Sequence, residues 1–162
     1  MSRTVRVREA ASRSDHEKAA MLFIEYAGAL GFGLDFQDFE KELRDLPGCY
    51  AGPRGRVLLG FVDNELAGCV AMRPLGETTC EMKRLFVRDG FRGAGLGRAL
   101  AEAVIICARE AGYATMRLDT LASMAEANAL YASLGFDEIE PYYHNPIPSA
   151  VFFELRLLGD GP

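Results

Sequence analysis

The sequence of 162 residues lacks the features that would place it in a special class of protein. No apolar run approaches the ~20 residues of a membrane span. The first residues alternate polar and apolar side chains, where a signal peptide would be continuously apolar. We therefore expect a cytoplasmic protein with no membrane partner. Linkers, low-complexity segments and repeats are also lacking, which predicts a single domain over residues 1–162.

Metal ligands and reactive thiols are scarce. The chain has two histidines and four cysteines without a Cys-x-x-Cys pair, so we expect no metal site. The cysteines are interpreted as small buried thiols. The net charge of −5 argues against nucleic-acid binding, which needs a basic surface, and mildly favours a cationic or neutral substrate.

Hydrophobic periodicity predicts a mixed α/β domain. Apolar positions at helical spacing predict four helices. They cover residues 14–30, 35–46, 95–111 and 125–134. Strand patterns cover residues 5–8, 57–62, 66–72, 79–87, 115–120, 136–139 and 150–157. The order β-α-α-β-β-β-α-β-α-β-β predicts a mixed sheet with helices on both faces.

Two of the predicted helices have recognisable start signals. Ser14 and Glu17 have the spacing of a capping box at the start of the first helix. The second helix is expected to begin at Asp35 and to stop at Pro47, because proline cannot continue a helix.

The densest chemical signal precedes the third helix. Its three glycines permit close backbone approach to a ligand, and the helix start offers unpaired N–H groups and a positive dipole end. These properties predict an anion site suited to a pyrophosphate. A P-loop would end in Gly-Lys-Ser/Thr, and a dinucleotide fingerprint would have a different glycine spacing. A tight turn without a ligand is the structural alternative. The segment reads Arg92-Gly93-Ala94-Gly95-Leu96-Gly97-Arg98.

Two stretches resemble the GNAT superfamily of N-acetyltransferases. The first, Glu81-Met82-Lys83-Arg84-Leu85-Phe86-Val87-x4-Arg92-Gly93-x-Gly95-Leu96-Gly97, resembles the central motif of that superfamily. The second, Asn128-Ala129-Leu130-Tyr131-x-x-Leu134-Gly135-Phe136, is similar to another of its motifs. The resemblance implies a GNAT-type acyl-CoA N-acyltransferase fold. Its central sheet is mixed but mostly antiparallel, with about seven strands flanked by about four helices.

The resemblance also implies an activity and a coenzyme site. The chain would move an acetyl group from acetyl-CoA, a cosubstrate, to a primary amine of a small molecule, amino acid or peptide, by direct attack in a ternary complex. GNAT proteins are often dimers, so a homodimer is also implied. The backbone of the strand would pair with the pantetheine arm, and the glycine segment would hold the pyrophosphate. The implied coenzyme contacts are Leu85, Phe86, Val87, Arg92, Gly93, Ala94, Gly95, Leu96, Gly97, Arg98, Asn128 and Tyr131.

Two residues are candidates for proton transfer. An alkyl amine has a pKa near ~10, so a base or a water relay must remove its proton. Glu81 occupies a position where several GNAT members have a catalytic carboxylate, and alternation places Glu81, Lys83, Leu85 and Val87 on one face up to an expected bulge. An exposed strand glutamate, with bulk water as base, is the alternative. Tyr131 could protonate the leaving thiolate or could pack in the core.

The acceptor site is expected among loops and the first helix. The implied substrate-binding residues are Tyr26, Phe32, Arg84, Tyr143 and His144. Arg84 could bind a substrate carboxylate or be solvated. Two other functions remain open at this stage, a non-catalytic acyl-CoA-binding or regulatory module and a nucleotide-binding module of dinucleotide type.

Overall fold

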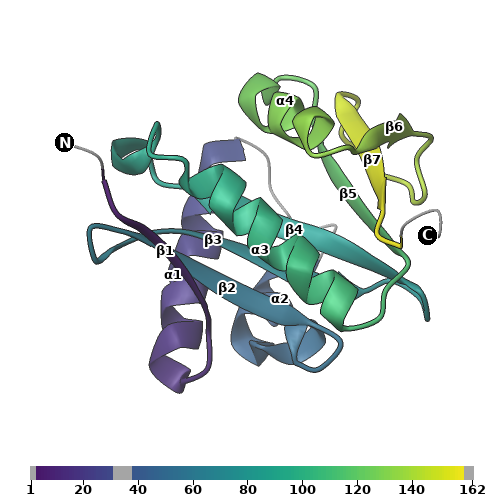
Figure 1. Cartoon of the computed structure of the whole chain (residues 1–162). Coiled ribbons are helices and arrows are strands. Elements are labelled where there is room, and N and C mark those ends of the chain that lie inside the picture. The colour runs from purple at the N-terminus through teal and green to yellow at the C-terminus, as the bar shows by residue number, and fades with distance from the viewer. Residues whose placement is uncertain (1–2, 31–37, 159–162) are drawn as a thin grey trace.

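A computed structural model describes residues 3–30 and 38–158 (Figure 1). The element order agrees with the order predicted from periodicity. The strands are β1 (Val5–Glu9), β2 (Arg56–Val62), β3 (Glu65–Pro74), β4 (Thr79–Val87), β5 (Thr115–Leu121), β6 (Asp137–Ile139) and β7 (Ala150–Arg156). The helices are α1 (Arg13–Leu30), α2 (Phe39–Asp45), α3 (Leu96–Glu110) and α4 (Ala125–Ser133).

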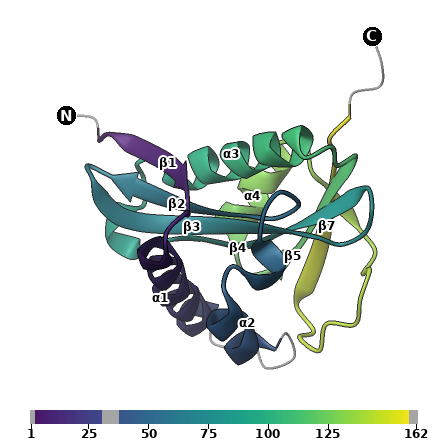
Figure 2. The ribbon, with the colours of Figure 1, turned by 90° about the horizontal axis from the view of Figure 1, so that it is seen from below.

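The strands form one seven-stranded sheet in the order β1-β2-β3-β4-β5-β7-β6. The pair β4–β5 is parallel, and the other neighbouring strands are antiparallel. Helices α1 and α2 cover one face of the sheet, and α3 and α4 cover the other (Figure 2). The predicted mixed, mostly antiparallel fold is confirmed.

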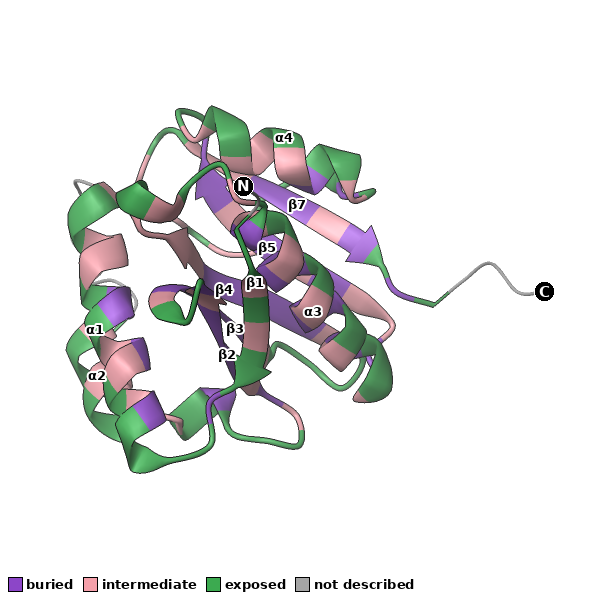
Figure 3. Ribbon diagram, turned by 60° about the vertical axis from the view of Figure 1, so that its left-hand side comes forward, coloured by how far each residue is buried: buried purple, intermediate pink, exposed green. Residues whose placement is uncertain are grey.

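Two hydrophobic clusters lie on the two faces. One joins the sheet to α3 and includes Leu96, Leu100 and Val104. The other joins it to α1 and includes Leu22 and Phe23. Burial is concentrated on the central strands, whereas the outward sides of the helices are exposed (Figure 3).

Two glycines allow α3 to approach the sheet closely. A Cβ at Gly60 would lie 2.7 Å from a methyl carbon of Leu96, and one at Gly68 would lie 2.5 Å from the carbonyl oxygen of Phe86. Larger residues would force the helix or the strand to shift. The glycines therefore determine where the start of α3 lies relative to β2 and β3.

The start of α1 differs from the predicted capping box. The backbone N–H of Asp15 donates to Ser12 Oγ at 3.1 Å, and Asp15 Oδ2 accepts from the backbone N–H of Ser12 at 3.4 Å. The capping pair is therefore Ser12 with Asp15, two residues before the predicted Ser14 and Glu17. Asp15 is favoured over Glu17 as the acidic member of the pair, because its buried carboxylate also forms an ion pair with Arg8 at 2.8 Å. The predicted start of the second helix at Asp35 lies outside the described residues.

The bulge expected in β4 is present, and it changes the alternation of the side chains beyond it. Cys69 is opposite Phe86 and Ala71 is opposite Lys83, so β4 has one extra residue between them. Arg84 has a φ of 63°, which accommodates that residue. Beyond the bulge, Leu85 and Val87 pack against the α3 cluster, whereas Phe86 packs against the α1 cluster. Leu85 and Val87 therefore do not share the face of Glu81.

The cysteines are less uniformly buried than expected. Cys69 and Cys80 are buried, Cys107 is half-buried and Cys49 is exposed. Cys49 belongs to a short 3₁₀ turn, Gly48–Tyr50, in which Tyr50 is the residue that packs inward.

Within residues 3–30 and 38–158, no helix has the length and apolarity to cross a bilayer.

Candidate active site

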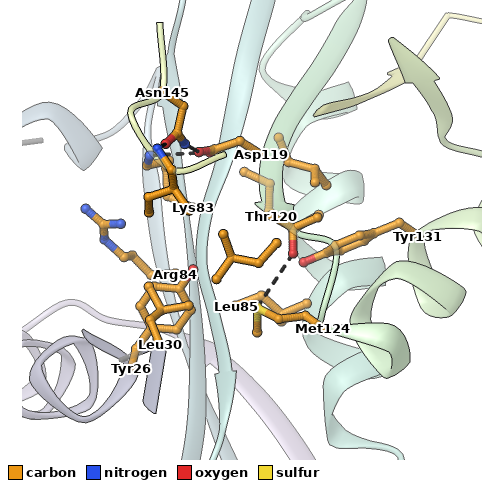
Figure 4. Close-up of a pocket in the computed structure, with 14 residues that line it drawn as sticks. Tyr26, Leu30, Lys83, Arg84, Leu85, Asp119, Thr120, Met124, Tyr131 and Asn145 are labelled. Carbon is orange, nitrogen blue, oxygen red and sulfur yellow. Dashed lines mark hydrogen bonds and ion pairs between the residues drawn. The ribbon is translucent and has the colours of Figure 1, made fainter. Parts of the chain in front are cut away.

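Strands β4 and β5 separate to form a cleft. They pair only where residues 79–81 face residues 115–117, and then diverge (Figure 1). The cleft is lined by side chains from both strands, α1, α4 and the loop before β7 (Figure 4). Leu85 from β4 and Tyr131 from α4 point toward one another across it (Figure 4). A parallel pair that opens in this way exposes backbone groups of both strands to a ligand.

The glycine segment lies at the start of α3. Gly93 and Gly95 both have a φ of 87°, a conformation that side chains other than glycine rarely adopt. A Cβ at either position would meet no atom within 4 Å among the described residues, so the backbone there faces open space. Two positive-φ glycines before a helix N-terminus form the kind of concave backbone surface that binds phosphate. The segment therefore fits a pyrophosphate.

Two arginines border this segment. Arg98 Nη2 donates to Ser133 Oγ at 2.6 Å, which links the start of α3 to the end of α4. Arg92 forms an exposed ion pair with Asp89 at 3.3 Å. Both guanidinium groups lie on the surface near the glycines and can meet an anion without desolvation of a buried charge.

Asn128, on α4, is hydrogen-bonded to the cleft residue Leu121 and has an unsatisfied acceptor. Its Nδ2 donates to the carbonyl oxygen of Leu121 at 3.1 Å. Its Oδ1 is buried and has no hydrogen-bond partner in the described part of the chain. A buried carbonyl without a donor is costly, so this atom is suited to accept from a ligand N–H. An amide of a pantetheine arm would supply such a donor.

Tyr131 is buried, and its ring contacts the rings of Phe136 and Phe153 at centroid distances of 5.7 and 5.9 Å. It also lines the cleft. Burial raises the pKa of its hydroxyl well above the ordinary value, so the group retains its proton at neutral pH. Its ring therefore belongs to the core while its position allows contact with a cleft ligand, and both predicted roles are compatible with this geometry.

Glu81 is buried and held by two donors. Arg73 Nε donates to Oε1 at 2.7 Å, and the hydroxyl of Tyr142 donates to Oε2 at 2.6 Å. The Lys83 ammonium lies 4.0 Å from Oε1. Glu81 is thus not an exposed strand glutamate, because its side chain is only 1% exposed.

A second carboxylate lies beside the first. Asp119 Oδ2 accepts from the Tyr143 hydroxyl and, at 3.1 Å, from Asn145 Nδ2. Lys83 Nζ is 3.8 Å from Asp119 Oδ1 (Figure 4) and 4.0 Å from Glu81 Oε1, so the ammonium lies between the two carboxylates. Burial lowers the pKa of Lys83, partly offset by Glu81 and Asp119. The pKa of the Tyr143 phenol is raised, first by burial and then by Asp119.

Arg84 at the bulge is bound internally. Its Nε and Nη2 donate to Glu42 of α2 at 3.0 and 2.8 Å. Its guanidinium carbon also lies 5.5 Å from the ring centroid of Phe39 and 5.9 Å from that of Tyr26. Arg84 therefore joins the bulge to α1 and α2, and a role in binding substrate through it would require Glu42 to share the guanidinium.

The other residues predicted for the acceptor site fall in different places. Tyr26 lines the cleft, and burial raises its pKa to about 12. Tyr143 lines a neighbouring cavity. His144 is exposed and lines neither space. Phe32 lies outside the described residues.

Three site residues were not predicted from the sequence: Arg73, Arg117 and Asp119. The loop that contains Tyr142 was expected to flank the acceptor site, but the contact of Tyr142 with Glu81 was not predicted. Arg117 and Asp119 alternate with Met116 and Leu118 along β5, so their common face could have been recognised. For the other two residues no local signal exists, because Arg73 and Tyr142 reach Glu81 from distant parts of the chain.

The neighbouring cavity has a volume of about 580 Å³ and opens on the α2 side of the sheet. It shares Lys83 and Arg84 with the cleft, so the two spaces adjoin at β4. A volume of this size holds a small molecule. The lining residues are Asp38, Glu42, Arg73, Leu75, Glu81, Lys83, Arg84, Arg117, Tyr142 and Tyr143.

Relatives of known sequence and structure resemble this chain over most of its length. An uncharacterized N-acetyltransferase of Schizosaccharomyces pombe is 41% identical over 145 residues, which cover 88% of this chain and 89% of that protein. Human N-acetylaspartate synthetase is 31% identical over 124 residues, 71% of this chain but 41% of that protein. The PaiA N-acetyltransferase of Thermoplasma acidophilum, solved with coenzyme A, has a TM-score of 0.71 and 16% identity over 94% of this chain and 99% of that one.

A family model agrees with these likenesses. The model described as the acetyltransferase (GNAT) family matches residues 20–136, which contain both the glycine segment and the Asn128–Tyr131 motif. The splayed strands, the open glycine turn and the sequence relatives lead to the same family. The chain is a member of the GNAT family of acetyltransferases.

Proposed function

We propose that this protein transfers the acetyl group of acetyl-CoA to the primary amine of a small acceptor while both are bound. The observation that carries the proposal is the junction of the two spaces at Lys83 and Arg84. A coenzyme arm in the β4–β5 cleft and an acceptor in the 580 Å³ cavity would meet there. Direct attack needs this arrangement, because both reactants must be held within contact distance.

The coenzyme site is proposed to use the backbone more than side chains. The N–H groups of residues 93–98 would hold the pyrophosphate, with Arg92 and Arg98 beside them. The backbone of Leu85, Phe86 and Val87 would pair with the pantetheine arm, and Asn128 Oδ1 would accept from one of its amides. When bound, acetyl-CoA supplies an activated acetyl thioester.

The reaction forms a bond between the acceptor nitrogen and the acetyl carbon and breaks the bond from that carbon to sulfur. The nitrogen loses a proton, and the departing thiolate gains one. The Tyr131 hydroxyl is proposed to give the latter proton, and its raised pKa keeps the proton available. A backbone N–H near Val87 is proposed to stabilise the negative oxygen that develops during attack.

The acceptor proton is proposed to leave through the Tyr142–Glu81 pair. Each Glu81 oxygen already accepts one hydrogen bond and the side chain is only 1% exposed, so direct approach of the ammonium is restricted. The Tyr142 hydroxyl can instead accept the acceptor's proton, directly or through one water, and pass its own proton to Glu81. This route uses the 2.6 Å hydrogen bond already present.

The size of the cavity narrows the class of acceptor. The volume of the cavity favours a small molecule or amino acid over a protein side chain. The name of the human relative, N-acetylaspartate synthetase, also favours an amino acid. The test is transfer of isotope-labelled acetyl from acetyl-CoA to a panel of amines, amino acids and peptides, followed by mass spectrometry. Labelled product from a small amine is expected; label that stays on acetyl-CoA with every acceptor would contradict the proposal.

A further inference from the structure

A row of charged residues crosses the sheet beside the proposed acceptor site. Arg73 on β3 is the register partner of Glu81 on β4, which in turn is the partner of Arg117 on β5. Neighbouring strands lie ~4.8 Å apart, so the two arginines are about 10 Å apart with Glu81 between them. All three side chains line the 580 Å³ cavity.

Each arginine uses only part of its hydrogen-bonding capacity. Arg73 donates from Nε to Glu81 at 2.7 Å, and Arg117 donates from Nε to Glu154 at 2.8 Å. These are the only hydrogen bonds that either guanidinium makes within the described residues. The two terminal nitrogens of each therefore have no partner there, although the side chains are 38% and 34% exposed, so they are only partly open to solvent.

This arrangement suits recognition of carboxylates. A guanidinium anchored by Nε has a fixed orientation, and its two terminal N–H groups match the geometry of a carboxylate. Arg117 is further oriented by the Tyr142 ring, whose centroid is 5.4 Å from the guanidinium carbon. If the row served only to stabilise the sheet, the terminal nitrogens of the two arginines would not need to face a cavity.

We propose that the acceptor is an amino-dicarboxylic acid, with one carboxylate bound by Arg73 and the other by Arg117. The amine then lies between the two carboxylates, toward Glu81 and Tyr142. Each charged group of the substrate therefore faces a group of opposite charge in the row. Lys83 and Arg84 hold no part of this recognition, because they are engaged within the protein. The inference rests on the proposed acetyl transfer and specifies its substrate.

The acceptor test compares molecules that differ by one carboxylate. We expect kcat/KM for L-aspartate or L-glutamate to exceed that for asparagine, glutamine and the corresponding α-amides by at least tenfold, because each charged contact contributes about 1.5–3 kcal/mol. Equal efficiency with the side-chain amides or with the α-amides would overturn the two-carboxylate inference. Efficient acetylation of an amine without any carboxylate would also overturn it, while leaving acetyl transfer intact. Absence of turnover with every acceptor would reject both proposals.

The protein test uses the two arginines. Arg117→Gln should raise KM for the dicarboxylic acceptor by about 10- to 100-fold and leave KM for acetyl-CoA unchanged. Arg117→Lys should recover part of the loss, because it keeps the charge without the paired donors. Arg13→Gln, an exposed residue of α1, is the matched control and should change neither constant. Arg117 variants with unchanged acceptor KM would overturn the assignment.

Discussion

At the scale of single residues, the role of Glu81 depends on what already surrounds it. The carboxylate is 1% exposed and both oxygens have donors, Arg73 on one side and Tyr142 on the other. Such a group is held in one orientation, and the Tyr142 hydroxyl offers it a direct route for a proton. In the proposed proton transfer, Glu81 and Tyr142 therefore act as one unit.

Replacement of Glu81 by glutamine tests this unit. Glutamine keeps the shape but cannot accept the proton, so the variant should bind acetyl-CoA normally and lose rate near neutral pH. The rate should recover as pH rises, because free amine becomes abundant near its pKa of ~10. The measurement is kcat/KM for the acceptor from about pH 6 to 10.

A second variant separates proton transfer by Glu81 and Tyr142 from positioning of the acceptor by Glu81. Tyr142→Phe removes the hydroxyl without the carboxylate and should give a pH profile of the same shape as Glu81→Gln. Profiles of both variants that coincide with the wild type would show that neither group carries the proton. A uniform loss at all pH values would instead indicate that Glu81 positions the acceptor.

Tyr131 is tested by removal of one oxygen. Tyr131→Phe keeps the ring contacts with Phe136 and Phe153, so stability and acetyl-CoA affinity should stay nearly constant. Turnover should fall by about 10²–10⁴-fold, as is typical when a general acid is lost. The check is kcat alongside the dissociation constant of acetyl-CoA. If kcat stays within about twofold, Tyr131 serves only in packing.

The residues predicted for the coenzyme and for proton transfer share a property: they lie in short contiguous motifs. Glu81, Asn128 and Tyr131 could be recognised from their neighbours along the chain. Arg73 and Tyr142 could not, because their importance arises from contact with Glu81 across strands and across a loop. Tertiary pairing of this kind leaves no periodic trace in either segment.

At the scale of elements, the α3 start is the part most directly suited to anion binding. Gly95 caps the helix at a φ of 87° with open space where a Cβ would be. Acetyl-CoA at 100 times its dissociation constant should stabilise the wild type by about 2.7 kcal/mol. Gly95→Val should abolish this gain, because valine opposes a positive φ and fills the open space. Differential scanning calorimetry with and without ligand measures the gain.

The control for this variant must separate folding from binding. Gly112→Ala also replaces a positive-φ glycine with open space around it, but at the far end of α3. It should lower Tm without ligand and keep the ligand-induced shift. An undiminished shift in Gly95→Val would remove the glycine turn from the binding site.

The corrected capping pair of α1 makes a separate prediction about stability. Ser12→Ala removes the acceptor for the Asp15 N–H and should cost about 1 kcal/mol, or about 2–4 °C in Tm. Ser14→Ala should have little effect, since Ser14 Oγ only accepts an exposed contact from Lys18. The experiment is thermal unfolding of both variants, and the reverse order of effects would support the capping box predicted from sequence.

The same cap should respond to acid. The Arg8 side chain and the Ala11 N–H hold the pKa of Asp15 well below its usual value. A lowered folded-state pKa means that this stabilisation is complete above the unfolded pKa near ~3.9 and is lost as pH falls through the folded value. Asp15→Asn should therefore show a smaller loss of stability between about pH 5 and pH 2 than the wild type. Equal losses in urea unfolding would contradict this coupling.

The order of the helices and strands was predicted better than their internal details, and the bulge in β4 shows why. Periodicity identified β4 from Thr79 to Val87, in agreement with the structure. It could not locate the extra residue of the bulge, because the positive φ of Arg84 is stabilised by Glu42, which comes from α2. A bulge reverses the side-chain alternation beyond it, so Leu85 moved to the face opposite that predicted.

At the scale of the whole molecule, the proposed reaction requires both halves of the chain. The first half supplies β3, β4 and α2, and the second supplies β5, α4 and the loop with Tyr142 and Tyr143. The β4–β5 cleft and the 580 Å³ cavity, which the proposal assigns to coenzyme and acceptor, lie where these halves meet at β4 and β5. Contiguous motifs predicted the proposed coenzyme residues, whereas the proposed acceptor side consists of loops and cross-strand contacts that become visible only in the fold.

The most direct test of the central claim is a two-substrate initial-velocity measurement of thiol release from acetyl-CoA. Acetyl-CoA and L-aspartate are varied together, with asparagine and a carboxylate-free amine as matched acceptors. The account predicts amine-dependent release that saturates in both substrates and gives intersecting reciprocal plots, as expected when both are bound before transfer. Acetyl-CoA binding without amine-dependent thiol release would contradict it and indicate a non-catalytic binding module; parallel plots would exclude direct attack in a ternary complex.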